Sequence, residues 1–128
     1  RPRFDPRELA AELRYLLDQS VQARLRSLGR VGSMLSGGLD SSSVAMLAAR
    51  SLPEPLPTFS AVTRTAGCIE TAMVRHVQAY GTFAAHDLVA EDSAAIAAEV
   101  QQLISRTNPL GGSTVMIGCL YRLAGQQG

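Results

Sequence analysis

The chain has 128 residues, 46% of them hydrophobic and 18% charged, and its formal net charge is +1. This size and composition fit one soluble globular domain and no more, and the nearly neutral charge gives no sign of a nucleic-acid partner. All 12 basic residues are Arg, which excludes a Lys Schiff base, a phosphate-binding loop of the GxxxxGKS/T type and a kinase-type catalytic Lys.

A long amphipathic helix is predicted over residues 4–28. Asp5 can accept a backbone hydrogen bond at its start, and Pro6 has the backbone angle of the first helical position. Apolar residues then recur every three or four positions, which predicts one buried face: Leu9, Leu13, Leu16, Leu17, Val21, Leu25 and Leu28. Gly29 marks the expected end of the helix.

The rest of the chain alternates short apolar or β-branched runs with helical periodicity. Strands are predicted at residues 31–35, 58–63 and 83–89. Helices are predicted at residues 44–50, 70–80, 96–104 and 115–124. This alternation indicates parallel strands joined by right-handed crossovers. The predicted fold class is therefore α/β, a doubly wound parallel sheet with helices on both faces, incomplete, with about three strands present.

The polar turn after the first strand reads SGGLDSSS and begins at Ser36. Ligands of such sheets bind beyond the carboxyl ends of the strands, near helix amino termini. Gly37 and Gly38 let the backbone approach an anion closely, and the free amides and dipole of the next helix attract it. Ser36, Ser41 and Ser42 add hydroxyl donors. The turn therefore predicts a phosphate site that requires no Lys.

Asp40 stands out in this turn, because a carboxylate beside a phosphate site repels the ligand. A divalent cation between Asp40 and the phosphate oxygens removes the conflict, and Mg²⁺ is the usual choice. The alternative is an ordinary turn between strand and helix, in which Asp40 serves only as the helix N-cap.

The string SGGLDSS at Ser36–Ser42 resembles the pyrophosphate loop of the ATP pyrophosphatases. Within that group the sequence is most similar to the asparagine synthase domain of glutamine-hydrolysing asparagine synthetases. Three further features agree: the long helix before the loop strand, the LPTFSAV run at Leu56–Val62, and a helix that Glu70 opens and Gly81-Thr82 closes. The resemblance implies an adenine-nucleotide alpha-hydrolase-like fold over residues 1–128, with a glutaminase domain expected upstream and the rest of the synthase domain downstream.

The resemblance also implies a reaction and its cofactors, ATP and Mg²⁺. ATP would activate the aspartate side-chain carboxylate as an acyl-adenylate, and glutamine-derived ammonia would attack it to form the amide. The residues implied for pyrophosphate binding are Ser36, Gly37, Gly38, Asp40, Ser41 and Ser42. Asp40 would also hold Mg²⁺, and backbone near Met34 and Ala61 would flank the adenine.

Some positions depart from the family pattern. Family members often carry His-His where this chain has Ala84-Ala85, and an acidic pair before Pro where it has Thr107-Asn108. A second acidic, glycine-rich loop and the catalytic residues are expected beyond Gly128, so the segment alone should be inactive. Two alternatives stay open: a β-lactam-forming or peptide-cyclising synthetase, and a nucleotide-binding module that has lost catalysis.

The cellular setting is read from what the sequence lacks. No apolar run approaches the ~20 residues of a membrane span, and no signal-peptide pattern opens the chain. Cys68 and Cys119 are expected to be buried free thiols. We therefore expect a cytoplasmic protein with small-molecule partners, no membrane or nucleic acid, and homo-oligomers at full length.

The remaining polar candidates have mainly structural interpretations. His86 is expected to be structural and His76 solvated. Glu70 is a helix-start charge or a substrate contact. Arg106 and Arg122 are solvated, or bind a carboxylate or phosphate through two hydrogen bonds.

Overall fold

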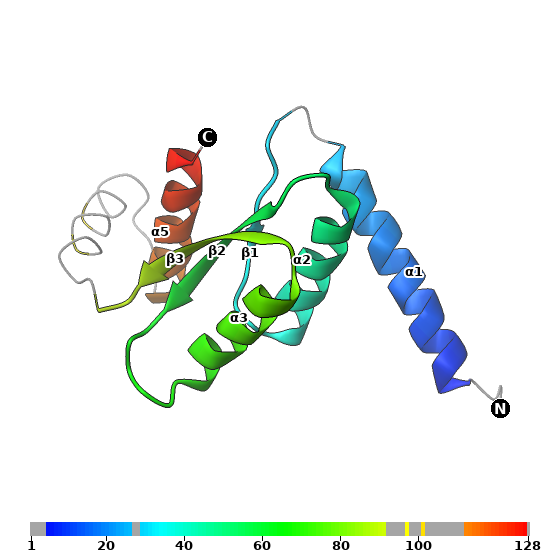
Figure 1. The fold of residues 1–128 in the computed structure, drawn as a ribbon, viewed down its shortest axis with the longest axis horizontal. Coiled ribbons are helices and arrows are strands. Elements are labelled where there is room, and N and C mark those ends of the chain that lie inside the picture. The colour runs from blue at the N-terminus through cyan, green and yellow to red at the C-terminus, as the bar shows by residue number, and fades with distance from the viewer. Residues whose placement is uncertain (1–4, 27–28, 92–96, 98–100, 102–111, 128) are drawn as a thin grey trace.

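The computed structural model describes residues 5–26, 29–91, 97, 101 and 112–127 (Figure 1). The elements in chain order are α1 (Pro6–Leu25), β1 (Ser33–Met34), α2 (Leu39–Ser51), β2 (Leu56–Val62), α3 (Ile69–Tyr80), β3 (Phe83–Val89) and α5 (Gly112–Gln126). Most of the helix predicted at residues 96–104 lies outside the described residues, as do Arg106 and Thr107-Asn108.

The three strands form one parallel sheet in the order β1-β2-β3. Met34 is level with Phe59, and β3 pairs with β2 from Leu56↔Phe83 to Val62↔Val89. The predicted α/β class is thus confirmed. The first strand is shorter than predicted because only Ser33 and Met34 pair with β2. The Leu35 N–H still donates to the Phe59 carbonyl at 2.9 Å.

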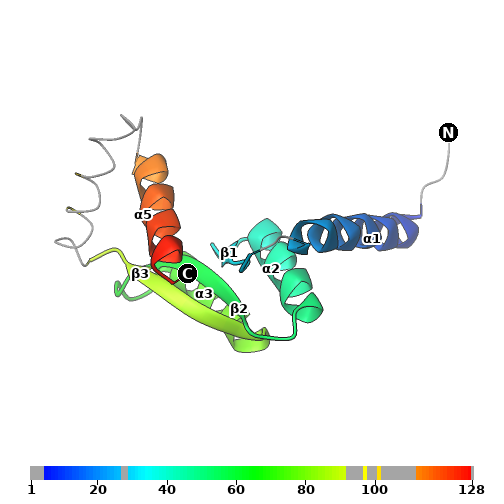
Figure 2. The same cartoon turned by 90° about the horizontal axis from the view of Figure 1, so that it is seen from above.

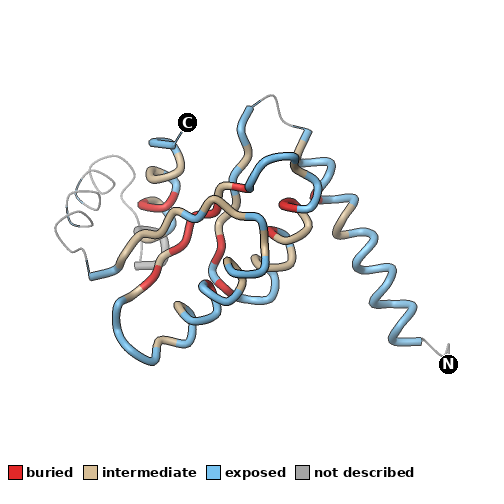
Figure 3. Tube along the Cα trace, in the orientation of Figure 1, coloured by how far each residue is buried: buried red, intermediate tan, exposed pale blue. Residues whose placement is uncertain are grey.

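Helices cover both faces of the sheet (Figures 1 and 2). α2 and α3 pack on one face of the sheet, and α5 contacts β2 and β3. α5 covers the opposite face, where its residues Tyr121 and Ala124 line a cavity together with Phe59 of β2. The core lies on the α2 and α3 side, where the buried residues gather (Figure 3). Its members are Val21, Leu35, Ala45, Ala48, Ala49, Leu56, Val62 and Val74. The three alanines of α2 have small side chains, which allow that helix to lie close to the sheet.

The helix α1 forms as predicted, but most of its apolar face is not buried. The predicted N-cap is confirmed, because the Arg7 N–H donates to Asp5 Oδ1 at 2.9 Å. Val21 is buried, yet Leu13 is 66% exposed. α1 extends away from the sheet, so only its carboxyl-terminal part joins the core (Figures 1 and 3). It ends at Leu25, short of the predicted residue 28.

α3 is attached to β3 through one acidic side chain. Asp87 forms an ion pair with Arg75 and accepts a hydrogen bond from Gln78 Nε2 at 3.0 Å. The Arg75 side chain is 55% exposed, so solvent screens the pair and its contribution to stability is small. The contact connects α3 to β3 at this position.

The two cysteines differ in burial. Neither cysteine forms a disulfide among the described residues; Cys119 is buried as predicted, but Cys68 is half-buried. That part of the prediction is wrong because Cys68 is the N-cap of α3, where the chain enters the helix from an exposed loop. A hydrogen bond with Thr71 lowers the pKa of the Cys68 thiol.

Among the described helices, none has the length and apolar character to cross a membrane.

Two hydroxyl side chains lie buried in the core face of β2. Thr58 and Ser60 are both 0% exposed, and neither hydroxyl has a partner among the described residues. A buried unpaired hydroxyl costs about 1–3 kcal/mol, and Val replaces the hydroxyl of Thr with a methyl of similar shape. We expect Thr58→Val to raise the free energy of unfolding of the complete protein by about 1 kcal/mol in urea denaturation. A lower unfolding midpoint would show that the hydroxyl is hydrogen-bonded.

Candidate nucleotide-binding site

The polar loop lies where the fold places ligands. It follows Leu35 at the carboxyl end of β1 and leads directly into α2 at Leu39. Because the strands are parallel, the carboxyl ends of β2 and β3 lie at the same edge of the sheet. Ligands of open α/β sheets bind at this edge, so the predicted phosphate site has the expected position.

Gly37 is the most constrained residue of the loop. It is buried, and its φ of +77° lies in the left-handed region that favours glycine. A Cβ at this position would lie 2.7 Å from the Val74 backbone nitrogen and 3.0 Å from the Met73 carbonyl carbon. The loop therefore rests directly on the α3 backbone, with no space for a side chain between them.

The start of α2 tests whether Asp40 is the helix N-cap. The N-cap is Gly38, which makes no side-chain capping bond, and Asp40 lies in the first helical turn with its side chain exposed. The N-cap interpretation of Asp40 is therefore wrong. The Ser42 N–H donates to the Gly38 carbonyl at 3.0 Å. Amides of the preceding positions have no partner four residues back, so they and the helix dipole favour an anion beside Asp40.

Two serine hydroxyls form a closed set of hydrogen bonds inside the loop. Ser41 Oγ donates to the Gly38 carbonyl at 3.2 Å and accepts from the Ser36 N–H, also at 3.2 Å. The Ser36 and Ser41 hydroxyls are 2.9 Å apart. Because the Ser41 hydroxyl donates its proton to the Gly38 carbonyl, the Ser36 hydroxyl is the donor in the hydrogen bond between the two serines. Ser36 Oγ in turn accepts from the Gly38 N–H at 3.4 Å.

The third predicted hydroxyl, that of Ser42, takes no part in these bonds. Its oxygen is buried and has no hydrogen-bond partner among the described residues. Ser42 instead lines a cavity of about 660 Å³ between α1, α2 and α3. The structure thus brings Ser36, Gly38 and Ser41 together, whereas Ser42 contributes its backbone to the helix start.

The sequence profile of the asparagine synthase family matches residues 12–128. The chain belongs to the asparagine synthase family. It is similar to glutamine-hydrolysing asparagine synthetases of Bos taurus and Mus musculus, each 42% identical over 64 residues, which is 46% of this chain and 11% of the relative. The enzyme of Cricetulus griseus is 42% identical over 62 residues, covering 44% of this chain and 11% of that protein. The match thus spans about a tenth of the length of these relatives.

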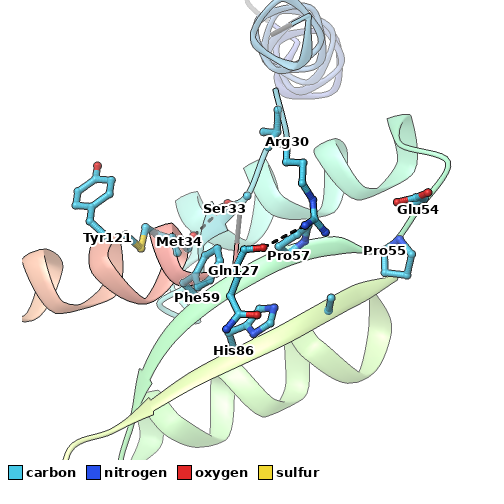
Figure 4. Close-up of a pocket in the computed structure, with 14 residues that line it drawn as sticks. Arg30, Ser33, Met34, Glu54, Pro55, Pro57, Phe59, His86, Tyr121 and Gln127 are labelled. Atoms are coloured by element: carbon cyan, nitrogen blue, oxygen red, sulfur yellow. Dashed lines mark hydrogen bonds between the residues drawn. The ribbon is translucent and has the colours of Figure 1, made fainter. Parts of the chain in front are cut away.

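The two strand positions predicted to flank adenine lie near the SGGLDSS loop. Met34 is the last residue of β1 and pairs with Phe59 of β2. Ala61 lies two residues after Phe59 on β2. Met34 lines a cavity of about 650 Å³ beside α5 (Figure 4). Phe59 and His86 also line this cavity, and their rings stack with centroids 5.1 Å apart. This stacking agrees with a structural role for His86. Residues 36–42 do not line it, so the two features are distinct.

The remaining polar candidates lie on α3 and α5. His76 is exposed, with its ring 4.9 Å from that of Tyr80. Glu70 is exposed in the first turn of α3. Arg122 is half-buried on α5. The hydrogen bonds described above for Ser36, Gly38 and Ser41 involve neither His76 nor Glu70.

The Asp40 carboxylate fits a metal ion that would bind together with the phosphates of a nucleotide. Within the described ranges no group of three His, Cys, Asp or Glu side chains could hold a metal ion. Mg²⁺ does not need such a cage, because it commonly binds through one or two carboxylates and completes its shell with substrate phosphates and water. A single exposed carboxylate beside an anion site fits that requirement.

One acidic residue at the same edge of the sheet was not predicted from the sequence. Glu91 follows β3, and its carboxylate accepts hydrogen bonds from Thr63, Thr65 and the Arg64 backbone. These bonds, that from Thr63 first, lower the pKa of Glu91 to about 2. No local motif connects positions 28 residues apart, and only the pairing of β2 with β3 brings them together.

Proposed function

We propose that this chain forms the nucleotide-binding part of an ATP-dependent amide-forming ligase. The aspartate side-chain carboxylate attacks the α-phosphorus of ATP, and the bond to pyrophosphate breaks. Glutamine-derived ammonia then displaces AMP from the acyl-adenylate, which yields asparagine. The observation that carries the proposal is the SGGLDSS loop at the carboxyl edge of the sheet, in a chain of the asparagine synthase family.

Each loop residue has a role in the proposal. Backbone amides at Gly37, Gly38 and the start of α2, with the Ser36 and Ser41 hydroxyls, hold the pyrophosphate portion. Ser42 supports the helix start, because its N–H donates to the Gly38 carbonyl. Asp40 holds Mg²⁺, which when bound supplies positive charge next to the leaving pyrophosphate. Backbone at Met34 and Ala61 flanks the adenine.

The proposal extends to the complete protein. A glutaminase domain upstream supplies ammonia, and the rest of the synthase domain downstream supplies the catalytic residues and a second metal ligand. The complete protein acts in the cytoplasm as a homo-oligomer on small-molecule substrates. The family membership and the activity for which the mammalian relatives are named support the ligase part of this proposal.

The test is pyrophosphate release by the complete protein from ATP and Mg²⁺, with and without aspartate. We expect release that depends on aspartate, with asparagine as the product when glutamine is added. No release with any carboxylate would contradict the ligase proposal. ATP binding by calorimetry without turnover would indicate a binding module instead.

A second candidate acceptor follows from one sequence feature. Ala84-Ala85 stands where family members often carry His-His, and Ala84 and Ala85 lie on β3, next to the strand that follows the nucleotide loop. A β-lactam-forming or peptide-cyclising synthetase would use the same loop with another carboxylate. Mass spectrometry of the product separates these reactions, because only asparagine synthesis consumes free aspartate.

A further inference from the structure

We infer that Glu91 is a positioning residue for the nucleotide-binding loop, acting through the segment that joins β2 to α3. The inference rests on the proposed function. Glu91 does not contact the loop itself in any hydrogen bond of the described residues. Its effect is carried by three successive contacts.

The first contact holds the segment at the end of β3. Glu91 Oε1 accepts from the hydroxyls of Thr63 and Thr65, the latter at 3.2 Å, and from the Arg64 N–H at 3.0 Å. Thr63 Oγ1 also accepts from the Thr65 N–H at 3.0 Å, a turn in which a hydroxyl replaces a backbone carbonyl. Residues 63–65 are thus folded around one carboxylate oxygen.

The second and third contacts continue to the loop. The Thr63 N–H donates to Thr71 Oγ1 at 3.0 Å, in the first turn of α3. Two residues further on, the α3 backbone at Met73 and Val74 lies against Gly37. A shift of residues 63–65 therefore changes the support on which Gly37 rests.

The segment lacks apolar anchors that could replace Glu91. Residues 64–67 are all exposed. Gly67 has a φ of +81°, and a Cβ added there would meet nothing within 4 Å, so no packing fixes this residue. Hydrogen bonds to an ionised acceptor are shorter and stronger than neutral ones. The ionised Glu91 thus anchors the segment to the end of β3.

The test compares Glu91→Ala and Glu91→Gln in the complete protein, with Glu12→Gln on the exposed side of α1 as the matched control. Supporting partners of a binding site typically change affinity or activity by about 10–100-fold. We expect Glu91→Ala to raise the KM for MgATP in pyrophosphate release by about tenfold, with kcat changed by less than about twofold. Glu91→Gln keeps an acceptor oxygen and should recover part of the loss, and Glu12→Gln should match the unchanged protein.

Amide hydrogen exchange gives a readout that needs no activity. In Glu91→Ala the amides of Arg64 and Thr65 should exchange at least about tenfold faster, and the Gly38 amide should also lose protection. Faster exchange at residues 64–65 with an unchanged KM would overturn the inference, and so would unchanged exchange at those amides. If the unchanged protein releases no pyrophosphate, the proposed function fails, while the Gly38 exchange result still decides whether Glu91 positions the loop.

Discussion

Asp40→Asn is expected to reduce pyrophosphate release by the complete protein by at least about 10²-fold, in the range seen when one charge-stabilising group is lost from an active site. The substitution keeps the shape of the side chain but removes the negative charge that Mg²⁺ requires. Stability should change little, because Asp40 is exposed and an acidic residue in a first helical turn contributes only about 0.3–1 kcal/mol. A magnesium titration of the residual rate should show a higher half-saturating concentration.

Asp18→Asn is the matched control for this prediction. Asp18 lies in α1 and accepts a hydrogen bond from Gln22 at 2.8 Å, four residues along the same helix. The same chemical change therefore occurs away from the loop, and the rate should stay unchanged. An Asp40→Asn protein that keeps the full rate at every magnesium concentration would remove Asp40 from the metal site.

Gly37→Ala should both destabilise the protein and abolish ATP binding. The left-handed conformation costs a non-glycine residue about 1–2 kcal/mol, and the new methyl group would overlap the α3 backbone, where overpacking typically costs about 1–3 kcal/mol more. We expect a loss of at least about 2 kcal/mol in the free energy of unfolding. Urea denaturation measures the loss, and calorimetry with MgATP measures the binding.

Two other glycines separate the causes. Gly67 has a similar φ, +81°, but open space around it, so Gly67→Ala isolates the conformational cost of about 1–2 kcal/mol. Gly38 has a φ of −71° and an added Cβ would meet only Ser36 Oγ, at 3.4 Å. Gly38→Ala should therefore fold normally and weaken ATP binding by blocking close approach of the anion. Equal losses of stability at Gly37 and Gly67 would mean that contact with α3 is not the constraint.

Local patterns predicted the elements better than their burial. The bounds of β3 agree with the prediction, residues 83–89. α2 starts at Leu39, five residues before the predicted Val44, because Ser and Asp are as compatible with a first helical turn as with a loop. The periodicity of α1 predicted a buried face, but burial depends on a neighbouring element, and α1 contacts the core only near Val21.

The candidate loop residues can be found from the sequence, whereas Glu91 cannot, because the loop is continuous in sequence and the partners of Glu91 are distant. Ser36 to Ser42 form one continuous motif, whose glycines and hydroxyls indicate an anion site by themselves. The partners of Glu91 lie 26 to 28 residues away. Their meeting depends on the register of β2 with β3, which turn and periodicity signals do not determine.

The closed set of hydroxyl hydrogen bonds within the loop bears on which ligands the proposed site would prefer. Ser36 and Ser41 already bond to each other and to the Gly38 peptide group, so an incoming ligand must replace neutral acceptors that are in place. A neutral polar ligand offers bonds of similar strength and gains little from the exchange, whereas an anionic oxygen offers bonds roughly twice as strong. If the loop binds pyrophosphate as we propose, its serine hydroxyls are therefore expected to prefer an ionised phosphate over a neutral ester of the same shape.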